Sequence, residues 1–127
     1  MYSKKFDINT DMPAILKWLH THNVHIPGDD MPETGIIAQD AAGPIACVFL
    51  RKCEGGYAQV DGMTSNPERS PQERDAALHM LTRHIEYLAK RQGIRKLIAF
   101  SIDKNTLLRS YKHGYVSLPH TVIVKDL

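Results

Sequence analysis

The chain has 127 residues and a formal net charge of +2, with 43% hydrophobic and 24% charged residues. This length can bury the core of one domain, and the composition is ordinary for a globular protein. A charge so near neutral, without a dense block of Lys and Arg, argues against nucleic-acid binding. No apolar run approaches the roughly 20 residues that a membrane helix needs, so we expect no membrane association.

The two cysteines point to a reducing compartment. Cys47 and Cys53 fall in one expected strand, where their spacing sets them roughly 20 Å apart, too far for a disulfide. We therefore expect two reduced thiols and a cytoplasmic protein.

The first part of the chain predicts a strand, a helix and a loop. Alternation favours a strand over Tyr2–Ile8, and apolar residues at helical spacing favour a helix over Asp11–His22, capped by Thr10 or Asp11. The segment His25–Thr34 holds two prolines, a glycine and three acidic residues, which is typical of a loop.

Three strands joined by short turns are expected next, over Gly35–Gln39, Pro44–Lys52 and Tyr57–Met63. They predict an antiparallel meander. Gly62, near the end of the third strand, is a plausible position for a β-bulge.

A long helix is predicted from Pro71 to about Gln92. Ser70 and Glu73 form the pattern of a capping box, Pro71 suits the first helical position, and Gly93 ends the helix. A strand that leads through a short loop into such a helix is a common way to present backbone N–H groups to a phosphate.

The last third predicts a strand, a short helix and two final strands. Lys96–Ile102 reads as a central strand, parallel to the strand before the long helix. Asn105–His113 is the expected short helix, and Tyr115–Leu118 and Thr121–Val124 are the final strands.

The order of these elements predicts one α/β (α+β) domain over residues 1–127. It would contain a mixed, mainly antiparallel sheet flanked by helices, with one right-handed crossover in the middle.

Two segments resemble the GNAT superfamily of N-acetyltransferases. The run Met63-Thr64-Ser65-Asn66-Pro67, followed by the capped helix, is similar to the family's strand, Pro-containing loop and cofactor helix. The run from Asn105 through Tyr111 to Gly114-Tyr115 is similar to its late segment, and Val122–Leu127 resembles its last strand. The resemblance covers nearly the whole chain in element order, and it implies transfer of an acetyl group from acetyl-CoA to an amine.

The sequence departs from the family's cofactor motif, which is Arg or Gln, two residues, Gly, one residue, then Gly or Ala. Here Gln72 and Ala77 match, but Asp75 stands where a glycine would let the backbone approach the pyrophosphate. Its carboxylate, with that of Glu73, also sets negative charge at a helix end that attracts anions. The cofactor-binding residues implied by the resemblance are Met63, Thr64, Ser65, Gln72, Arg74, Asp75, Ala76, Ala77 and Asn105.

The resemblance also implies catalytic roles. Tyr111 matches the family's general acid, which would protonate the leaving thiolate, and Asp61 stands where some members carry an acidic residue that would serve as general base. The structural alternatives are an aromatic side chain packed on the sheet for Tyr111, an exposed strand residue for Asp61 and a helix N-cap for Asn105. His25–Glu33 would line the acceptor pocket, where Asp29, Asp30 and Glu33 would favour a cationic small-molecule or peptide amine.

Two functions stay open. One is an acetyl-CoA-dependent N-acetyltransferase; the other is a non-catalytic GNAT-fold binding or accessory protein that has lost tight coenzyme A binding, which Asp75 favours. His20, His22 and His25 do not share a helix face and complete no zinc pattern, so we expect no metal. Dimers are common in the family, which leaves a homodimer open.

Overall fold

The computed structural model describes residues 1–24 and 30–127, and it contains five strands and three helices in this part of the chain. In chain order these are β1 (Tyr2–Lys5), α1 (Ile8–Thr21), β2 (Gly35–Asp40), β3 (Gly43–Lys52), β4 (Tyr57–Ser65), α2 (Pro71–Arg91), β5 (Lys96–Ile98) and α3 (Lys104–Lys112).

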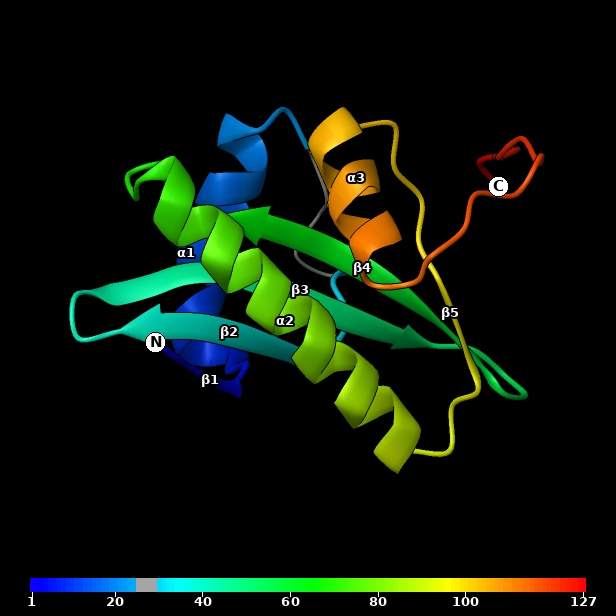
Figure 1. Cartoon of the computed structure of the whole chain (residues 1–127), viewed down its shortest axis with the longest axis horizontal. Coiled ribbons are helices and arrows are strands. Elements are labelled where there is room, and N and C mark those ends of the chain that lie inside the picture. The colour runs from blue at the N-terminus through cyan, green and yellow to red at the C-terminus, as the bar shows by residue number, and fades with distance from the viewer. Residues whose placement is uncertain (25–29) are drawn as a thin grey trace.

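The strands form one mixed sheet with the order β1-β2-β3-β4-β5. The pairs from β1 to β4 are antiparallel, and β5 runs parallel to β4. The predicted meander, the parallel pairing across the long helix and the α/β class are therefore confirmed. In Figure 1, α2 crosses one face of the sheet in front, and α1 lies behind it.

The sheet separates two apolar cores, and β3 contributes to both because alternate residues point to opposite faces. Val48 and Leu50 pack with Leu81 and Ile85 of α2, while Phe49 packs with the buried residues of α1. The ring of Phe49 meets that of Phe6 edge-on, with centroids 4.9 Å apart. Each helix is thus attached to the sheet by its own core.

The three helices begin at capping residues. The capping box of α2 is confirmed: the Glu73 amide donates to Ser70 Oγ, and the Ser70 amide donates to the Glu73 carboxylate. The predicted starts of the other two helices are wrong. Asp7 caps α1, three to four residues before the expected cap, because its carboxylate accepts the Asn9 amide. Asp103, and not Asn105, caps α3, because its carboxylate accepts the Thr106 amide.

The end of the chain differs most from the prediction. β5 stops at Ile98, and it lies at the edge of the described sheet rather than at its centre. Neither 115–118 nor 121–124 forms a strand. The Tyr115 amide donates to the Ser110 carbonyl, and the Tyr111 and Ser117 hydroxyls lie 2.6 Å apart. These contacts hold the start of the last segment against α3.

Both cysteines are free, as expected, with Cys47 buried and Cys53 exposed. Each helix in the described ranges is too short or too polar to cross a bilayer.

Candidate functional site

The candidate site lies where β4 and β5 separate. The two strands pair only from Tyr57 opposite Lys96 to Gln59 opposite Ile98, after which β4 continues to Ser65 without β5 beside it. Figure 1 shows the two strands diverging, with α3 above the opening. A gap of this kind leaves main-chain groups along the inner side of β4 without a partner from β5.

A β-bulge lies on β4 at the point where this opening begins. Cys47 pairs with Thr64 and Phe49 with Asp61, so one residue of β3 faces both Gly62 and Met63. Gly62 has φ of 58°, and a Cβ there would lie 2.9 Å from Phe49 Cδ2. Glycine is therefore required for both the backbone conformation and the space, and the predicted bulge is confirmed.

Asp61 precedes the bulge and is held by Arg51 of β3. Its Oδ2 accepts from Arg51 Nε and Nη2 at 3.1 and 2.9 Å, and its Oδ1 accepts the Gly62 amide at 2.8 Å. Arg51 also donates to the carbonyl of Asp30, at the near end of the segment outside the described residues. The carboxylate is thus fixed at the start of the opening.

Most backbone amides of the loop between β4 and α2 donate hydrogen bonds within the loop or to the start of α2. The Glu68 amide donates to Asn66 Oδ1, the Arg69 amide donates to the Asn66 carbonyl, and the Ser70 and Glu73 amides form the capping box. Amides that donate within the loop and helix cap are not available to a phosphate. This helix entrance is therefore a poor anion site as it stands.

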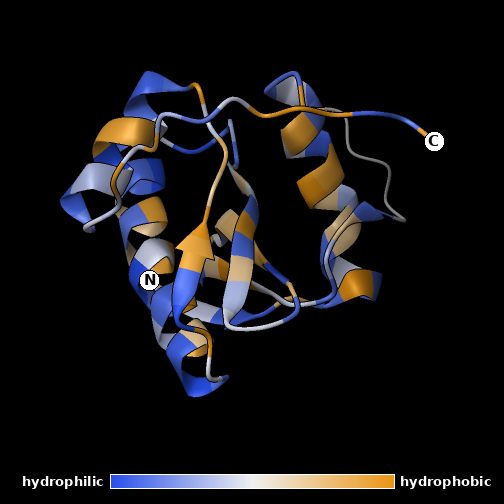
Figure 2. Ribbon diagram, turned by 90° about the vertical axis from the view of Figure 1, so that its right-hand side faces the viewer, coloured by the Kyte–Doolittle hydropathy of each residue, from blue (hydrophilic) through white to orange (hydrophobic). Residues whose placement is uncertain are grey.

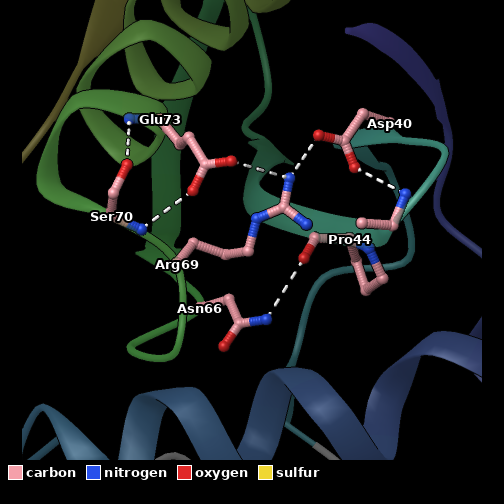
Figure 3. Close-up of polar contacts among 7 residues, drawn as sticks. Asp40, Pro44, Asn66, Arg69, Ser70 and Glu73 are labelled. Atoms are coloured by element: carbon pink, nitrogen blue, oxygen red, sulfur yellow. Dashed lines mark hydrogen bonds and ion pairs between the residues drawn. The ribbon is translucent and has the colours of Figure 1, made fainter.

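An arginine occupies the same entrance (Figure 3). Arg69 donates to the Asp40 carboxylate of β2 and lies 3.4 Å from Glu73 Oε1 of α2. The Arg69 hydrogen bond holds the pKa of Asp40 below its usual value, and the hydrogen bond from the Ser70 amide does the same for Glu73. The guanidinium thus joins the β2–β3 hairpin to the start of α2, and its charge is balanced by two carboxylates.

Asp75, which takes the place of a glycine in the motif that the sequence resembles, points toward α3. Its carboxylate lies 3.7 Å from Arg109 Nη2 of α3 and 3.7 Å from His79 Nε2 one turn further along α2. The side chain is 61% exposed, so these ion pairs are weak. Asp75 therefore contributes to the contact between the two helices rather than to an open phosphate loop.

Two histidines complete this contact. His79 Nδ1 of α2 and His113 Nε2, at the end of α3, lie 2.8 Å apart. One ring must donate and the other accept, so at least one imidazole has to be neutral. Burial lowers the pKa of His113, and the nearby His79, Arg83 and Arg109 lower it further against the opposing effect of Glu86.

We expect acid to weaken the attachment of α3. Because the pKa of His113 is lower in the folded protein than its ordinary value of 6.5, its neutral form stabilises the fold fully above that value. This stability is lost as the pH falls through the lowered pKa. The melting temperature should therefore fall more steeply below pH 6.5 in the wild type than in a His113→Gln variant. The control is His84→Gln, which changes an exposed histidine bonded to Ser3; equal slopes in all three proteins would contradict the expectation.

The residues predicted to bind the cofactor lie along the path from the bulge into α2. Thr64 and Ser65 are buried, and Met63 packs against the α2 core. Gln72 and Ala76 are exposed at the start of α2, Arg74 is partly buried, and Ala77 packs on the sheet.

The two residues predicted on α3 are both exposed. Asn105 lies in the first turn of α3 and has an exposed side chain. Tyr111 is 45% exposed and bonded to Ser117. Contacts between α2 and α3 bring this helix beside the cofactor path.

Reasoning from sequence missed four side chains of the site: Arg51, Arg69, His79 and His113. The register of the β3–β4 hairpin sets Arg51 opposite Gln59. Gln59 lies two residues before Asp61 on the same face of the sheet, so this register could have predicted Arg51 as the partner of Asp61. The pairing of His79 with His113 joins residues 34 apart in sequence, and no local pattern carries it.

The predicted acceptor side is described only in part. Asp29 and most of the predicted acceptor loop lie outside the described residues. Glu33 lines a shallow cavity of about 270 Å³ at the start of β2 and the end of β3, together with Arg51 and Lys52. The walls of this cavity therefore carry both signs of charge. No cluster of three metal-binding side chains is found among residues 1–24 and 30–127.

No family model matches the sequence, and no curated protein matches it. Solved structures do match. A Mycobacterium tuberculosis protein in complex with CoA and NLQ superposes with a TM-score of 0.79 at 10% identity, over 98% of this chain and 76% of its own. The ribosomal-protein-S18-alanine N-acetyltransferase of Escherichia coli gives 0.73 at 12% identity, over 89% and 76%. The N-acetylglutamate synthase of Neisseria gonorrhoeae, complexed with coenzyme A and L-arginine, gives 0.72 at 15% identity, over 87% of this chain and 26% of its own.

Proposed function

We propose that this chain, which has the fold of the GNAT acetyltransferases, transfers an acetyl group from acetyl-CoA to a primary amine. The opening between β4 and β5 beside the Gly62 bulge carries the proposal. It provides a strand, β4, that continues beyond the end of its pairing with β5, next to a carboxylate and a tyrosine-bearing helix.

The reaction needs three things from such a site. The amine must be neutral so that its lone pair can attack the thioester carbonyl, and the carbonyl oxygen must be stabilised as it gains charge. The carbon–sulfur bond then breaks, the nitrogen loses a proton and the thiolate gains one. Backbone amides near Met63 to Ser65 would stabilise the oxygen, Asp61 would accept the proton, and Tyr111 would donate one to sulfur.

Calorimetric titration with acetyl-CoA and with free CoA, followed by a thiol-release assay with a panel of amines, tests the proposal. We expect saturable binding and amine-dependent release of CoA. The absence of any binding heat at millimolar acetyl-CoA would overturn it. A cationic amine should be preferred if Asp30 and Glu33 line the acceptor side.

We expect Asp75→Asn to tighten CoA binding. Asp75 sits in the second turn of the helix that would face the diphosphate, and the repulsion of one such like charge is on the order of 1 kcal/mol in water. Removing it should lower the dissociation constant about fivefold, measured by the same titration. Glu54→Gln, an exposed acid in the turn before β4, is the charge-matched control. An unchanged or weaker affinity in Asp75→Asn would contradict this expectation.

A second candidate function is a non-catalytic GNAT-fold protein that acts by binding a partner. The observation that favours it is the helix entrance, where Arg69 is neutralised by two carboxylates and the loop amides donate within the loop. The acetyl-CoA titration distinguishes the two functions, since only the enzyme requires the thioester to bind.

A further inference from the structure

Basic side chains gather at the end of the molecule where α2 ends and β5 begins. Figure 1 shows the end of α2, the start of β5 and the turn between β3 and β4 at this same end. In Figure 2 the ribbon where α2 ends is mostly blue, which marks hydrophilic residues. Five exposed cationic residues lie here: Lys52, Lys90, Arg91, Arg95 and Lys96. This cluster is called the basic end.

The charges of the basic end are not neutralised by its surroundings. Within residues 1–24 and 30–127, none of the five cations forms an ion pair. The segments 50–57 and 86–98, which carry these cations, contain only two carboxylates, Glu54 and Glu86. The surface therefore keeps a net positive charge that is available to an anionic partner.

The dipole of α2 explains only part of this cluster. Cations in the last turn of a helix stabilise its negative end, which accounts for Lys90 and Arg91. Lys52 ends β3 and Lys96 starts β5, so neither lies on the helix. The sheet and the helix thus bring together cations that are spread over 45 positions of the sequence.

Two tyrosines lie against cations of the basic end. Lys96 Nζ is 5.1 Å from the centre of the Tyr57 ring, and the Arg91 guanidinium is 5.8 Å from the centre of the Tyr87 ring. Arg91 also donates to the Tyr87 hydroxyl at 3.2 Å. Tyr57 is 44% exposed and Tyr87 is 62% exposed, so both present aromatic surface to solvent.

Clustered cations beside exposed aromatic rings suit single-stranded nucleic acid, whose phosphates contact the cations and whose unpaired bases stack on the rings. Tyr57 and Tyr87 are the only large apolar side chains exposed within residues 50–57 and 86–98. The surface therefore offers no aliphatic side chain for insertion into a lipid bilayer. The small net charge of the whole chain does not reveal this surface, because carboxylates elsewhere offset it.

We propose that the basic end binds single-stranded nucleic acid. The cations contact its phosphates, and Tyr57 and Tyr87 stack on its bases. The opening between β4 and β5 begins after Gln59 and runs away from this end toward Ser65. A bound strand therefore leaves the candidate site accessible, and the binding does not depend on acetyl transfer.

Fluorescence anisotropy of a labelled oligouridylate of about 12 nucleotides, titrated with the full chain and without acetyl-CoA, tests the proposal. Each phosphate contact with a single strand adds about −0.7 to the slope of log affinity against log salt concentration, so five contacts should give about −3.5. Arg95→Gln with Lys96→Gln should change this slope to about −2.

Lys17→Gln with Lys104→Gln is the matched control for charge. It removes the same charge from exposed positions on α1 and α3, and it should keep the slope of the wild type. The absence of binding at about 0.1 mM protein and low salt would overturn the proposal. Equal slopes in the two double variants would overturn it as well.

A second pair of variants tests the stacking of bases. Tyr87→Ala should weaken binding about tenfold at constant salt, whereas Tyr87→Phe keeps the ring and should bind like the wild type. Both should fold with an unchanged circular dichroism spectrum, because Tyr87 is exposed on α2. Equal affinities of these two variants would contradict the proposal. Polyglutamate that competes as well as unlabelled oligouridylate would assign the surface to an acidic protein instead.

Discussion

Replacement of Gly62 by alanine should lower the free energy of unfolding by about 2–5 kcal/mol. The left-handed backbone at φ of 58° costs about 1–2 kcal/mol with a side chain present. The new methyl would lie 2.9 Å from Phe49 Cδ2 in a packed core, where overpacking costs about 1–3 kcal/mol. Urea denaturation followed by circular dichroism measures the loss.

Gly55→Ala is the matched control for this expectation. Gly55 has φ of 76°, but nothing lies within 4 Å of an added Cβ, so only the backbone cost applies. The difference between the two variants isolates the contact with Phe49. A Phe49→Leu background should reduce the effect of Gly62→Ala. Equal losses at Gly55 and Gly62 would contradict a role for packing at the bulge.

Tyr111→Phe should lower kcat for acetyl transfer by about 100-fold or more, because loss of a general acid typically costs 10²–10⁴ in rate. The phenol is 45% exposed on α3, and its hydroxyl is bonded only to Ser117 among the contacts described, so it is accessible to a leaving thiolate. The fold should survive, since removing an exposed hydroxyl leaves no buried polar group unpaired. Steady-state kinetics with the best amine of the panel provide the measurement.

Tyr87→Phe is the control for this loss of a hydroxyl. Tyr87 is an exposed residue of α2 whose hydroxyl is bonded to Arg91. It should leave kcat unchanged. Full turnover in Tyr111→Phe would remove this residue from the mechanism and leave protonation of the thiolate to solvent or to another group.

The sequence predicts those parts of the fold whose signals are local. The capping box at Ser70, the bulge at Gly62 and the meander all depend on residues within a few positions of one another. The predicted cap of α1, Thr10 or Asp11, is wrong because the carboxylate of Asp7 accepts the Asn9 amide and starts the helix about one turn earlier. In the structure Asp11 instead binds Lys4 and the Asp7 amide.

The final strands were predicted from composition. Thr121–Val124 has the β-branched residues of a strand, but composition does not say where the segment lies or what it pairs with. Contacts of Tyr115 and Ser117 with α3 decide where this segment goes, and no periodicity encodes them.

The sequence predicts the candidate site only where the residues of the site are consecutive in the chain. The path from Met63 into α2 was found because strand, loop and helix are consecutive. Arg109, which pairs with Asp75, and Arg51, which pairs with Asp61, lie on other elements, and so does Asp40, the β2 partner of Arg69. Whether the helix entrance is open depends on these partners, so the sequence shows the substitution at the motif glycine but not its structural role.

Because the backbone amides at the start of α2 are already engaged, the proposed acetyl transfer would depend on a particular part of the donor. If the amides there stay engaged with Asn66, Ser70 and Glu73, the nucleotide end of a donor has little to hold it. Recognition would then come from the pantetheine arm inserted between β4 and β5. Truncated donors without the adenosine moiety, such as acetyl-pantetheine, would serve nearly as well as the full-length thioester.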